Sequence, residues 1–408
     1  MMEIKEMNAA KARNKRIIDA ILRKAERDLP GVLDLVGIYG SFMSGDVHEK
    51  SDLDLLIVIR TPEGYALADG MILDDVRIGY DLYCMTWHGL AEEARFRDPN
   101  ISRLMDAEIV WSAGDEVLQK LEALRDQVRN QQSRPYGAAD YEAAAAVLDE
   151  AKQACRMLME QDTLAGAYRW AARALNSLEN AVAMLNRHYF RLGGRRRYQE
   201  LRQLVHIPVD FCEKIEEIAS AQSISGIQNG VKGLLDETAG CFEQVQKFYG
   251  LQAQDAGENF QGDHDPAQEE EKPAGEKSDA EKPDGRMLDD RVRDDKKPAT
   301  AENLRGTYEE MYSNWRNKMY LAAETGDRRL SLLTLASLDA MLQEIGEEID
   351  IPDYPVMEIY DPDDLVKNAE GFDRILEEYQ KVYEKAGMAV NHFPDVDAWA
   401  EAYLEKKD

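Results

Sequence analysis

Apolar residues recur with two different periods over the first 130 residues, which predicts a mixture of helices and strands. Segments with helical spacing of apolar residues are expected to be helices at 4–28, 86–96 and 116–130. Apolar or alternating runs are expected to be strands at 32–39, 53–59, 76–85 and, more briefly, 108–111. Pro30-Gly31 should end the first helix, and Thr86 should cap the second one. Few strands among several helices predict an α+β domain.

From Ala138 the pattern becomes helical, with frequent Ala, Leu, Glu and Gln. Helices are expected at 141–161, 164–192, 197–205, 209–221 and 224–251. Gly193-Gly194 and Ile207-Pro208 interrupt this pattern. The segment should therefore form an all-helical bundle, of a size that could close over one side of the first domain.

Residues 252–303 change character again, because apolar residues are few and Pro, Gly, Asp, Glu and Lys dominate, as in Glu269–Pro273. Such a stretch cannot bury enough apolar surface to offset its ordering entropy, which predicts a disordered acidic linker. Helical patterning then returns at 308–324, 328–349, 365–386 and 396–405. This last block has no chemical motif and is expected to be a small helical domain, an adaptor that could bind a protein partner.

The predicted organisation is a catalytic α+β domain, a helical bundle, an acidic linker and a second small helical domain, with boundaries at 1–135, 136–251, 252–303 and 304–408. Apolar runs are too short to span a membrane, and the N-terminus has no signal-peptide pattern. Four widely spaced cysteines lack metal or redox spacing and suggest a reducing compartment: Cys84, Cys155, Cys212 and Cys241. The cytoplasm is the expected location.

The charge of the chain bears on its substrates. A formal net charge of −29 opposes non-specific binding to nucleic acid, since phosphate contacts require clustered Lys and Arg. The same charge would attract a cationic substrate, although it also serves solubility alone. Nucleic acid is therefore an unlikely partner on composition.

Two aspartates give the first domain its candidate chemistry. The strand expected at 32–39 stops at Gly40-Ser41, and Asp52 and Asp54 open the next strand. Residues i and i+2 of a strand point to the same face, so the two carboxylates should lie side by side near the Gly-Ser turn. Paired carboxylates bind Mg²⁺ that arrives with phosphates, and a small turn with exposed amides can cradle a phosphate.

This pattern of Gly-Ser, about ten residues and then Asp-apolar-Asp-apolar resembles the polymerase-β-like nucleotidyltransferase superfamily. The resemblance implies that Asp52 and Asp54 hold Mg²⁺, and that Gly40 and Ser41, with Ser51 as a helper, contact the phosphates of ATP or another nucleoside triphosphate. A third carboxylate usually stands on a later strand, which points to Asp81 as a metal ligand or general base. A helical domain behind the catalytic one is similar to kanamycin and other aminoglycoside nucleotidyltransferases.

Other residues are weaker candidates. Many minimal relatives carry an Arg where this chain has Ser44, so Lys50 or Arg60 would have to supply the missing cation. Arg195–Arg197 could reach a triphosphate from an interhelical turn. Further candidates are His188 and His206, which invite comparison with the ribonuclease partner in toxin–antitoxin systems, and Glu142 and Glu150 as bases from the bundle.

The sequence thus favours a Mg²⁺-dependent enzyme that transfers a nucleoside monophosphate, AMP if the donor is ATP, to a hydroxyl of an aminoglycoside-like small molecule. Two alternatives stay open. The acceptor could be a protein, as in regulatory adenylylation or a toxin–antitoxin-type regulator. Alternatively, the chain is a nucleotide-binding interaction protein that has lost catalysis.

Overall fold

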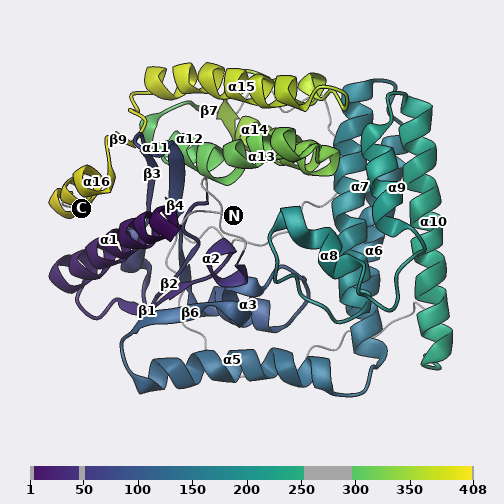
Figure 1. Ribbon diagram of the computed structural model, residues 1–408, viewed down its shortest axis with the longest axis horizontal. Coiled ribbons are helices and arrows are strands. Elements are labelled where there is room, and N and C mark those ends of the chain that lie inside the picture. Colours follow the sequence, from purple (N-terminus) through teal and green to yellow (C-terminus); the bar gives the residue numbers. More distant parts are fainter. Residues whose placement is uncertain (1–3, 46–50, 252–295, 407–408) are drawn as a thin grey trace.

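The computed structural model describes residues 4–45, 51–251 and 296–406 (Figure 1). Most of the segment expected to be a disordered linker, 252–295, lies outside the described residues, as does Lys50. The chain forms an N-terminal α+β part followed by a mostly helical remainder, which confirms the predicted fold class. None of the helices in these described ranges combines the length and apolar character that a membrane span requires.

The first sheet has the strand order β5-β2-β1-β6 and positions the Asp52/Asp54 motif. Its strands are β1 (Leu33–Ile38), β2 (Leu55–Ile59), β5 (Cys84–Thr86) and β6 (Glu108–Ser112). β1 pairs antiparallel with β2 and β6, while β2 pairs parallel with β5. Every residue of β2 is buried, as expected for an apolar run at the centre of a sheet.

A second sheet, of order β4-β3-β9, consists of β3 (Asp69–Leu73), β4 (Ile78–Leu82) and β9 (His392–Phe393). The single strand expected at 76–85 is wrong, because the chain changes sheets at Tyr83: β4 pairs with β3, and β5 pairs with β2. Strand β3 was not predicted, because Gly70 interrupts its apolar pattern. β9 was also missed, since two residues carry no recognisable period.

Helices surround these sheets. They are α1 (Ile4–Asp28), the short α2 (Ser41–Ser44), α3 (Trp87–Ala94), α4 (Ser102–Asp106) and α5 (Asp115–Ser133), with a 3₁₀ segment η1 (Pro62–Leu67). The α1 residues Ile17 and Ile21 are fully buried against the strands. Thr86 caps α3 as expected, because its hydroxyl accepts the backbone N–H of Gly89 at 3.4 Å.

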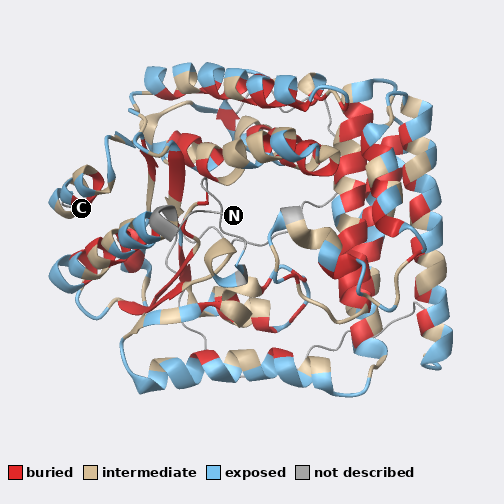
Figure 2. Cartoon of the chain, in the orientation of Figure 1, coloured by how far each residue is buried: buried red, intermediate tan, exposed pale blue. Residues whose placement is uncertain are grey.

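The bundle consists of α6 (Ala138–Met159), α7 (Leu164–Leu185), α8 (Arg197–Leu201), α9 (Phe211–Ser220) and α10 (Ile224–Phe248), with a 3₁₀ turn η2 (Gly194–Arg196). α7 is the central helix and is buried along most of its length (Figure 2). The helix expected at 164–192 ends at Leu185, because Asn186 caps it and Arg187 adopts φ 50°, which no continuing helix allows. Its frequent alanines let neighbouring helices approach closely.

The remaining elements follow residue 295. They are β7 (Lys297–Pro298), α11 (Ala301–Leu304), α12 (Thr307–Met311), the π-helical turn η3 (Tyr312–Arg316), α13 (Asn317–Thr325), α14 (Arg328–Glu348), β8 (Ile349–Asp350), η4 (Val356–Ile359), α15 (Leu365–Lys385) and α16 (Val396–Glu405). The helix expected at 308–324 is therefore interrupted by a π-helical turn. Figure 1 shows α13, α14 and α15 running from the α+β part to the bundle.

This last segment packs on both of the others. Arg329 of α14 donates to the Glu179 carboxylate of α7, and both side chains are almost completely buried. Trp399 and Tyr403 of α16 are buried in the same cluster as α1 and the N-terminal strands. The division at 1–135, 136–251 and 304–408 stays a prediction, and these contacts cross both of its boundaries.

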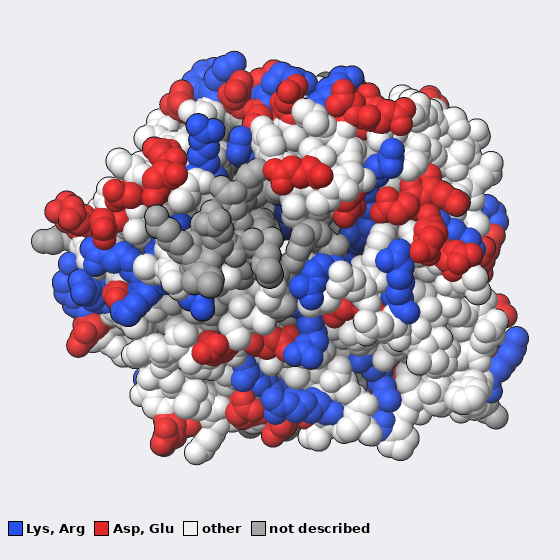
Figure 3. Space-filling model, in the orientation of Figure 1, with Lys and Arg blue, Asp and Glu red and all other residues white. Residues whose placement is uncertain are grey.

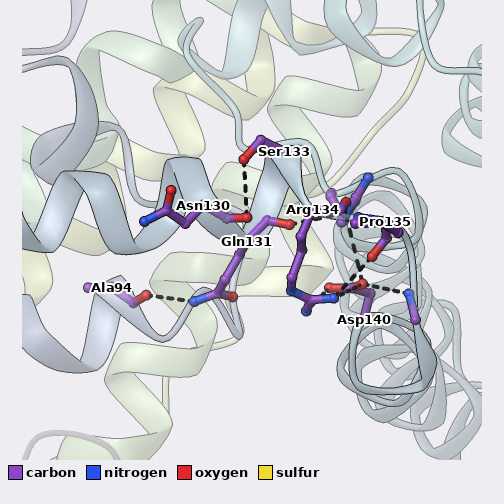
Figure 4. A network of polar contacts seen from close by, with 9 residues as sticks. Ala94, Asn130, Gln131, Ser133, Arg134, Pro135 and Asp140 are labelled. Carbon is purple, nitrogen blue, oxygen red and sulfur yellow. Dashed lines mark hydrogen bonds and ion pairs between the residues drawn. The ribbon is translucent and has the colours of Figure 1, made fainter.

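A polar network fixes the junction between α5 and α6 (Figure 4). Arg134 donates to both oxygens of Asp140, at 2.8 and 2.7 Å, and the Gly137 N–H donates to the same carboxylate at 2.9 Å. Gln131 donates to the Ala94 carbonyl at 3.2 Å. Bidentate pairs of this kind fix geometry as well as charge. The bundle is thus held at a defined angle to the α+β part.

Candidate active site

The Gly40-Ser41 turn and Asp54 fit together too closely for any other residue at position 40. Gly40 adopts φ 68° and ψ −141°, and a Cβ there would lie 1.8 Å from the Asp54 Oδ2. The Tyr39 N–H donates to the Asp54 carbonyl at 3.1 Å, which extends the β1–β2 pairing by one step. The backbone N–H of Ser41 donates to the Asp54 carboxylate. The turn therefore fixes one of the two predicted metal ligands.

Asp52 and Asp54 lie immediately before β2, as the pattern predicted, and both line one pocket. Burial away from water is the main cause that raises the pKa of Asp52 to about 7, and the charge of Asp54 is the second. Burial likewise raises the pKa of Asp54, against the opposing effects of Lys318 and the Ser41 N–H. Two neighbouring carboxylates with raised pKa values repel each other when ionised, so a bound cation would stabilise the ionised pair.

Asp81 lies on β4, in the second sheet, and not on the strand that carries the pair. Side chains along β4 point alternately to its two faces, so Tyr80 and Leu82 face the N-terminal core while Gly79 and Asp81 share the other face. Ser313 covers that face, since a Cβ on Gly79 would lie 2.7 Å from the Ser313 Cα. Burial raises the pKa of Asp81 to about 6.

Asp81 acts on Asp52 through its charge, at longer range. Its charge contributes to the raised pKa of Asp52, but Asp81 does not line the pocket that Asp52 and Asp54 share. Among the described residues, no three His, Cys, Asp or Glu side chains lie close enough together to hold one metal ion. The role of Asp81 as third ligand or base stays a prediction.

The pocket itself has a volume of about 270 Å³ and is built by three distant parts of the chain. The α+β part contributes the predicted turn and acids together with Ser51, and the bundle contributes the turn 191–194. The last segment contributes Ser313, Asn314, Asn317, Lys318, Leu321 and Leu330. The block without a recognisable motif thus forms one wall of the site.

Lys318 is the charged residue that the last segment contributes to the pocket. It is exposed at the start of α13, and its charge lowers the pKa of both Asp52 and Asp54. Lys318 was not among the predicted site residues, because a lysine in an amphipathic helix is an ordinary solvent-facing residue. No signal in the chain connects position 318 to positions 52 and 54 before the fold is known.

The buried carboxylate of Glu200 holds the turn 191–194, which the bundle contributes to the pocket. Glu200 accepts the backbone N–H groups of Arg191 and Leu192, at 2.9 and 3.0 Å, and lies 3.2 Å from the Nε2 of His188. His188 therefore supports a loop at the pocket. Arg191 lines the pocket and pairs with Asp106 at 3.2 Å.

Several weaker candidates lie elsewhere. Arg60 pairs with Asp34 at 2.5 Å, at the far end of β2 from Asp54. Arg197 donates to Glu179 and Asn100 and does not line the pocket. His206 contacts the Tyr249 ring, and Glu142 and Glu150 are exposed on α6. These residues do not supply the missing cation or the base in this pocket.

The ligand atoms available in the pocket fit a hard divalent cation such as Mg²⁺. The Asp52 and Asp54 carboxylates offer oxygen ligands only, and the Gly40 cradle holds one of them in place. Mg²⁺ is commonly bound by one or two carboxylates together with substrate phosphates and water, so a third protein ligand is not required. Asp52 and Asp54 are the residues that would hold the ion.

Comparison with known families agrees with this geometry. Residues 18–103 match the nucleotidyltransferase domain family. The matched range begins within α1, includes the Gly40-Ser41 turn and all three candidate aspartates, and ends within α4. A search of curated proteins found no match for the chain. The nucleotidyltransferase domain indicates nucleotidyl transfer from a nucleoside triphosphate as the general reaction, and residues outside 18–103 complete its pocket.

Proposed function

We propose that this protein is a Mg²⁺-dependent nucleotidyltransferase that transfers a nucleoside monophosphate, AMP from ATP, to a hydroxyl of a small-molecule acceptor. The observation that carries the proposal is the Asp52–Asp54 pair: two adjacent, desolvated carboxylates beside a Gly-Ser turn in a pocket. The matched domain family supports the reaction class.

Each residue of the motif has a role in the proposed reaction. Asp52 and Asp54 hold Mg²⁺, and the bound ion supplies charge neutralisation at the phosphate oxygens. The Ser41 N–H is used by Asp54, so phosphate contact falls to the Ser41 hydroxyl, the Gly40 backbone and Ser51. These groups orient the α-phosphorus toward the acceptor.

The transfer balances without a further reactant. The acceptor oxygen forms a bond to the α-phosphorus, while the bond from that phosphorus to the oxygen bridging to the β-phosphate breaks, and pyrophosphate leaves with the electron pair. The acceptor proton goes to a carboxylate, for which Asp81 is our candidate, and because Asp81 does not line the pocket, one bridging water would carry the proton to it. With a pKa of about 6, Asp81 is largely ionised at pH 7 and can accept a proton.

Charge favours a small and cationic acceptor. The chain carries a formal net charge of −29, and on the face shown in Figure 3 Lys and Arg lie interspersed with Asp and Glu instead of forming a stripe. Nucleic-acid recognition would call for such a basic stripe. An aminoglycoside-like amine alcohol matches both the hydroxyl chemistry and the sign of the protein's charge.

The test is incubation of the protein with Mg²⁺, ATP and a panel of amine-bearing alcohols, followed by pyrophosphate measurement and mass spectrometry. We expect one acceptor to gain the mass of a nucleoside monophosphate. Asp52→Asn combined with Asp54→Asn should abolish pyrophosphate release, whereas the surface control Asp126→Asn should not. Release that survives the double substitution would refute the metal site, and a labelled protein in a cell lysate would identify a protein as the acceptor.

A further inference from the structure

We propose that the last helical segment completes the nucleotide site, and that Lys318 binds the β- or γ-phosphate of the nucleoside triphosphate. This inference rests on the proposed function, since it assigns a substrate contact in the same pocket. It gives the segment after residue 295 a part in catalysis in place of the adaptor role expected from sequence.

The position of Lys318 near Asp52 and Asp54 suggests that a negatively charged ligand group binds between the lysine and the two carboxylates. Lys318 lines the pocket with Asp52 and Asp54 and lowers the pKa of both. Within the described parts of the chain, no carboxylate lies within 4 Å of its ammonium group. The lysine is therefore near enough to act on the acids through space, yet it is not consumed in an ion pair with either.

A phosphate group fits that arrangement. Asp52 and Asp54 would hold a divalent ion that neutralises part of the charge of a triphosphate, and Lys318, which lines the same pocket, would offer three donors to the remaining phosphate oxygens. The Asn314 and Asn317 side chains line the same wall and add amide groups to it. A monophosphate that contacts only the metal side would not need this lysine, but the β- and γ-phosphates of a triphosphate would.

The backbone that carries Lys318 is tightly held. The π-helical turn η3 lies between α12 and α13, and Ser313 within it donates to the Glu309 carbonyl at 2.8 Å. Gly79 of β4 allows the closest approach of this turn to the α+β part. π-Helical turns are frequent at functional sites, where they redirect a side chain. Here the turn brings the start of α13 over the acidic pair.

A second contact ties the turn to α15. Arg316 donates to both oxygens of Asp373, each at 2.8 Å, and Tyr320 donates to the same carboxylate at 2.6 Å. The Arg316 guanidinium also lies over the Tyr312 and Tyr320 rings, 5.1 and 4.7 Å from their centroids. These residues flank Lys318 on both sides in sequence. We therefore assign Asp373 as a positioning residue that acts through Lys318.

The decisive experiment compares nucleotide binding by calorimetry in the presence of Mg²⁺. The probes are a non-hydrolysable ATP analogue and AMP, and the variants are Lys318→Ala, Lys318→Arg and the control Lys381→Ala, which removes an exposed lysine of α15 away from the pocket. Lys318→Ala should weaken triphosphate binding by about 10- to 100-fold, the usual range for a charge-assisted hydrogen bond. AMP binding should change by less than about two-fold, Lys318→Arg should retain most of the affinity, and Lys381→Ala should match the wild type.

Three results would overturn the proposal. Unchanged triphosphate affinity in Lys318→Ala would remove the contact. An equal loss for AMP and the triphosphate would indicate general damage to the pocket. A rise in Mg²⁺ affinity with unchanged nucleotide affinity would show that Lys318 is only a counter-ion of Asp52 and Asp54.

Calorimetry and the transfer assay described above together separate this proposal from the proposed function. A wild type that binds the triphosphate with the predicted dependence on Lys318, but transfers nothing to any acceptor, keeps the phosphate contact and sinks the transferase assignment. A wild type that binds no triphosphate refutes both.

The positioning role of Asp373 has its own test. Asp373→Asn should weaken triphosphate binding several-fold and leave AMP binding unchanged, because the carboxylate acts on Lys318 and not on the pocket as a whole. In the Lys318→Ala background the same substitution should produce no further loss. An additive loss in the double variant would show that Asp373 only stabilises the fold.

Discussion

Gly40→Ala tests the geometry of the site more sharply than removal of a carboxylate, because it leaves every polar group in place. The added Cβ would lie 1.8 Å from the Asp54 Oδ2. A carbon and an oxygen in contact stay about 3.3 Å apart, so the carboxylate must move by about 1.5 Å. That displacement exceeds the roughly 0.5 Å within which a metal or catalytic site keeps its function.

Gly40→Ala should have a large effect on the transfer rate and a moderate effect on stability. A misplacement of about 1 Å in a positioned group costs on the order of 100-fold in rate, so nucleotidyl transfer by Gly40→Ala should fall by at least about that factor. The backbone conformation at φ 68° adds strain of about 1–3 kcal/mol. A protein of ordinary stability tolerates this strain, and the variant should remain folded.

Gly45→Ala provides the matched control. Gly45 also has a positive φ, 72°, but a Cβ there would meet no atom of the described residues within 4 Å. This variant should lose about 1–2 kcal/mol of unfolding free energy from strain alone and keep its transfer activity. The assays are urea unfolding and pyrophosphate release for both variants. Equal activity losses in the two variants would show that backbone strain, and not collision with Asp54, controls the site.

Further predictions concern charge and the contacts between segments. Because folding raises the pKa of Asp52 from 3.8 to about 7, the folded state loses stability as the pH rises between these two values, and the loss is complete above about 7. Asp52→Asn should therefore add about 1–2 kcal/mol to the free energy of unfolding at pH 8 and nothing at pH 4. A pKa shift of this size sets an upper limit of about 4 kcal/mol, and the effect should be smaller because the open pocket screens the charge. Urea unfolding at both pH values checks this prediction. In the wild type, Mg²⁺ affinity should rise as pH passes through about 7, with proton release visible in calorimetry; a flat profile from pH 6 to 8 would contradict the raised pKa. Glu179→Gln leaves the buried Arg329 without its countercharge and should cost about 3–5 kcal/mol in thermal or urea unfolding, against less than about 0.5 kcal/mol for the surface variant Asp126→Asn. Trp399→Ala should cost about 3–5 kcal/mol, and a loss under 1 kcal/mol would mean that α16 is not part of the N-terminal core.

The local pattern predicted those parts of the structure that depend on neighbours in sequence. Helix α1, the Thr86 cap and the Asp52–Asp54 motif before β2 all follow from spacing within one or two turns. Errors arose where pairing partners decide the outcome. The run 76–85 looks like one strand, yet it divides because β3 and β2 compete for its two halves.

The site was predictable only on its N-terminal side for the same reason. Asp52, Asp54 and Gly40 lie within fifteen residues of each other, so a short motif contains them. Lys318 and Asn314 reach the pocket only after the last segment folds back across the α+β part. No periodicity records such a contact, because it is set by packing between surfaces that are far apart in the chain.

The attachment of α16 to the N-terminal core sets an order of events during synthesis. The Tyr403 hydroxyl donates to the Leu67 carbonyl, 336 residues earlier in the chain. At translation rates of about 5–20 residues per second, roughly 17 to 70 seconds separate the appearance of these two partners. Throughout that interval the N-terminal domain lacks the Tyr403 ring that helps to seal its core, and for most of it the domain also lacks β9, which borders β3, and the pocket wall that carries Lys318. The N-terminal domain can therefore complete its fold only after the helices that follow residue 295 have been made, although its own sequence motif is synthesised first.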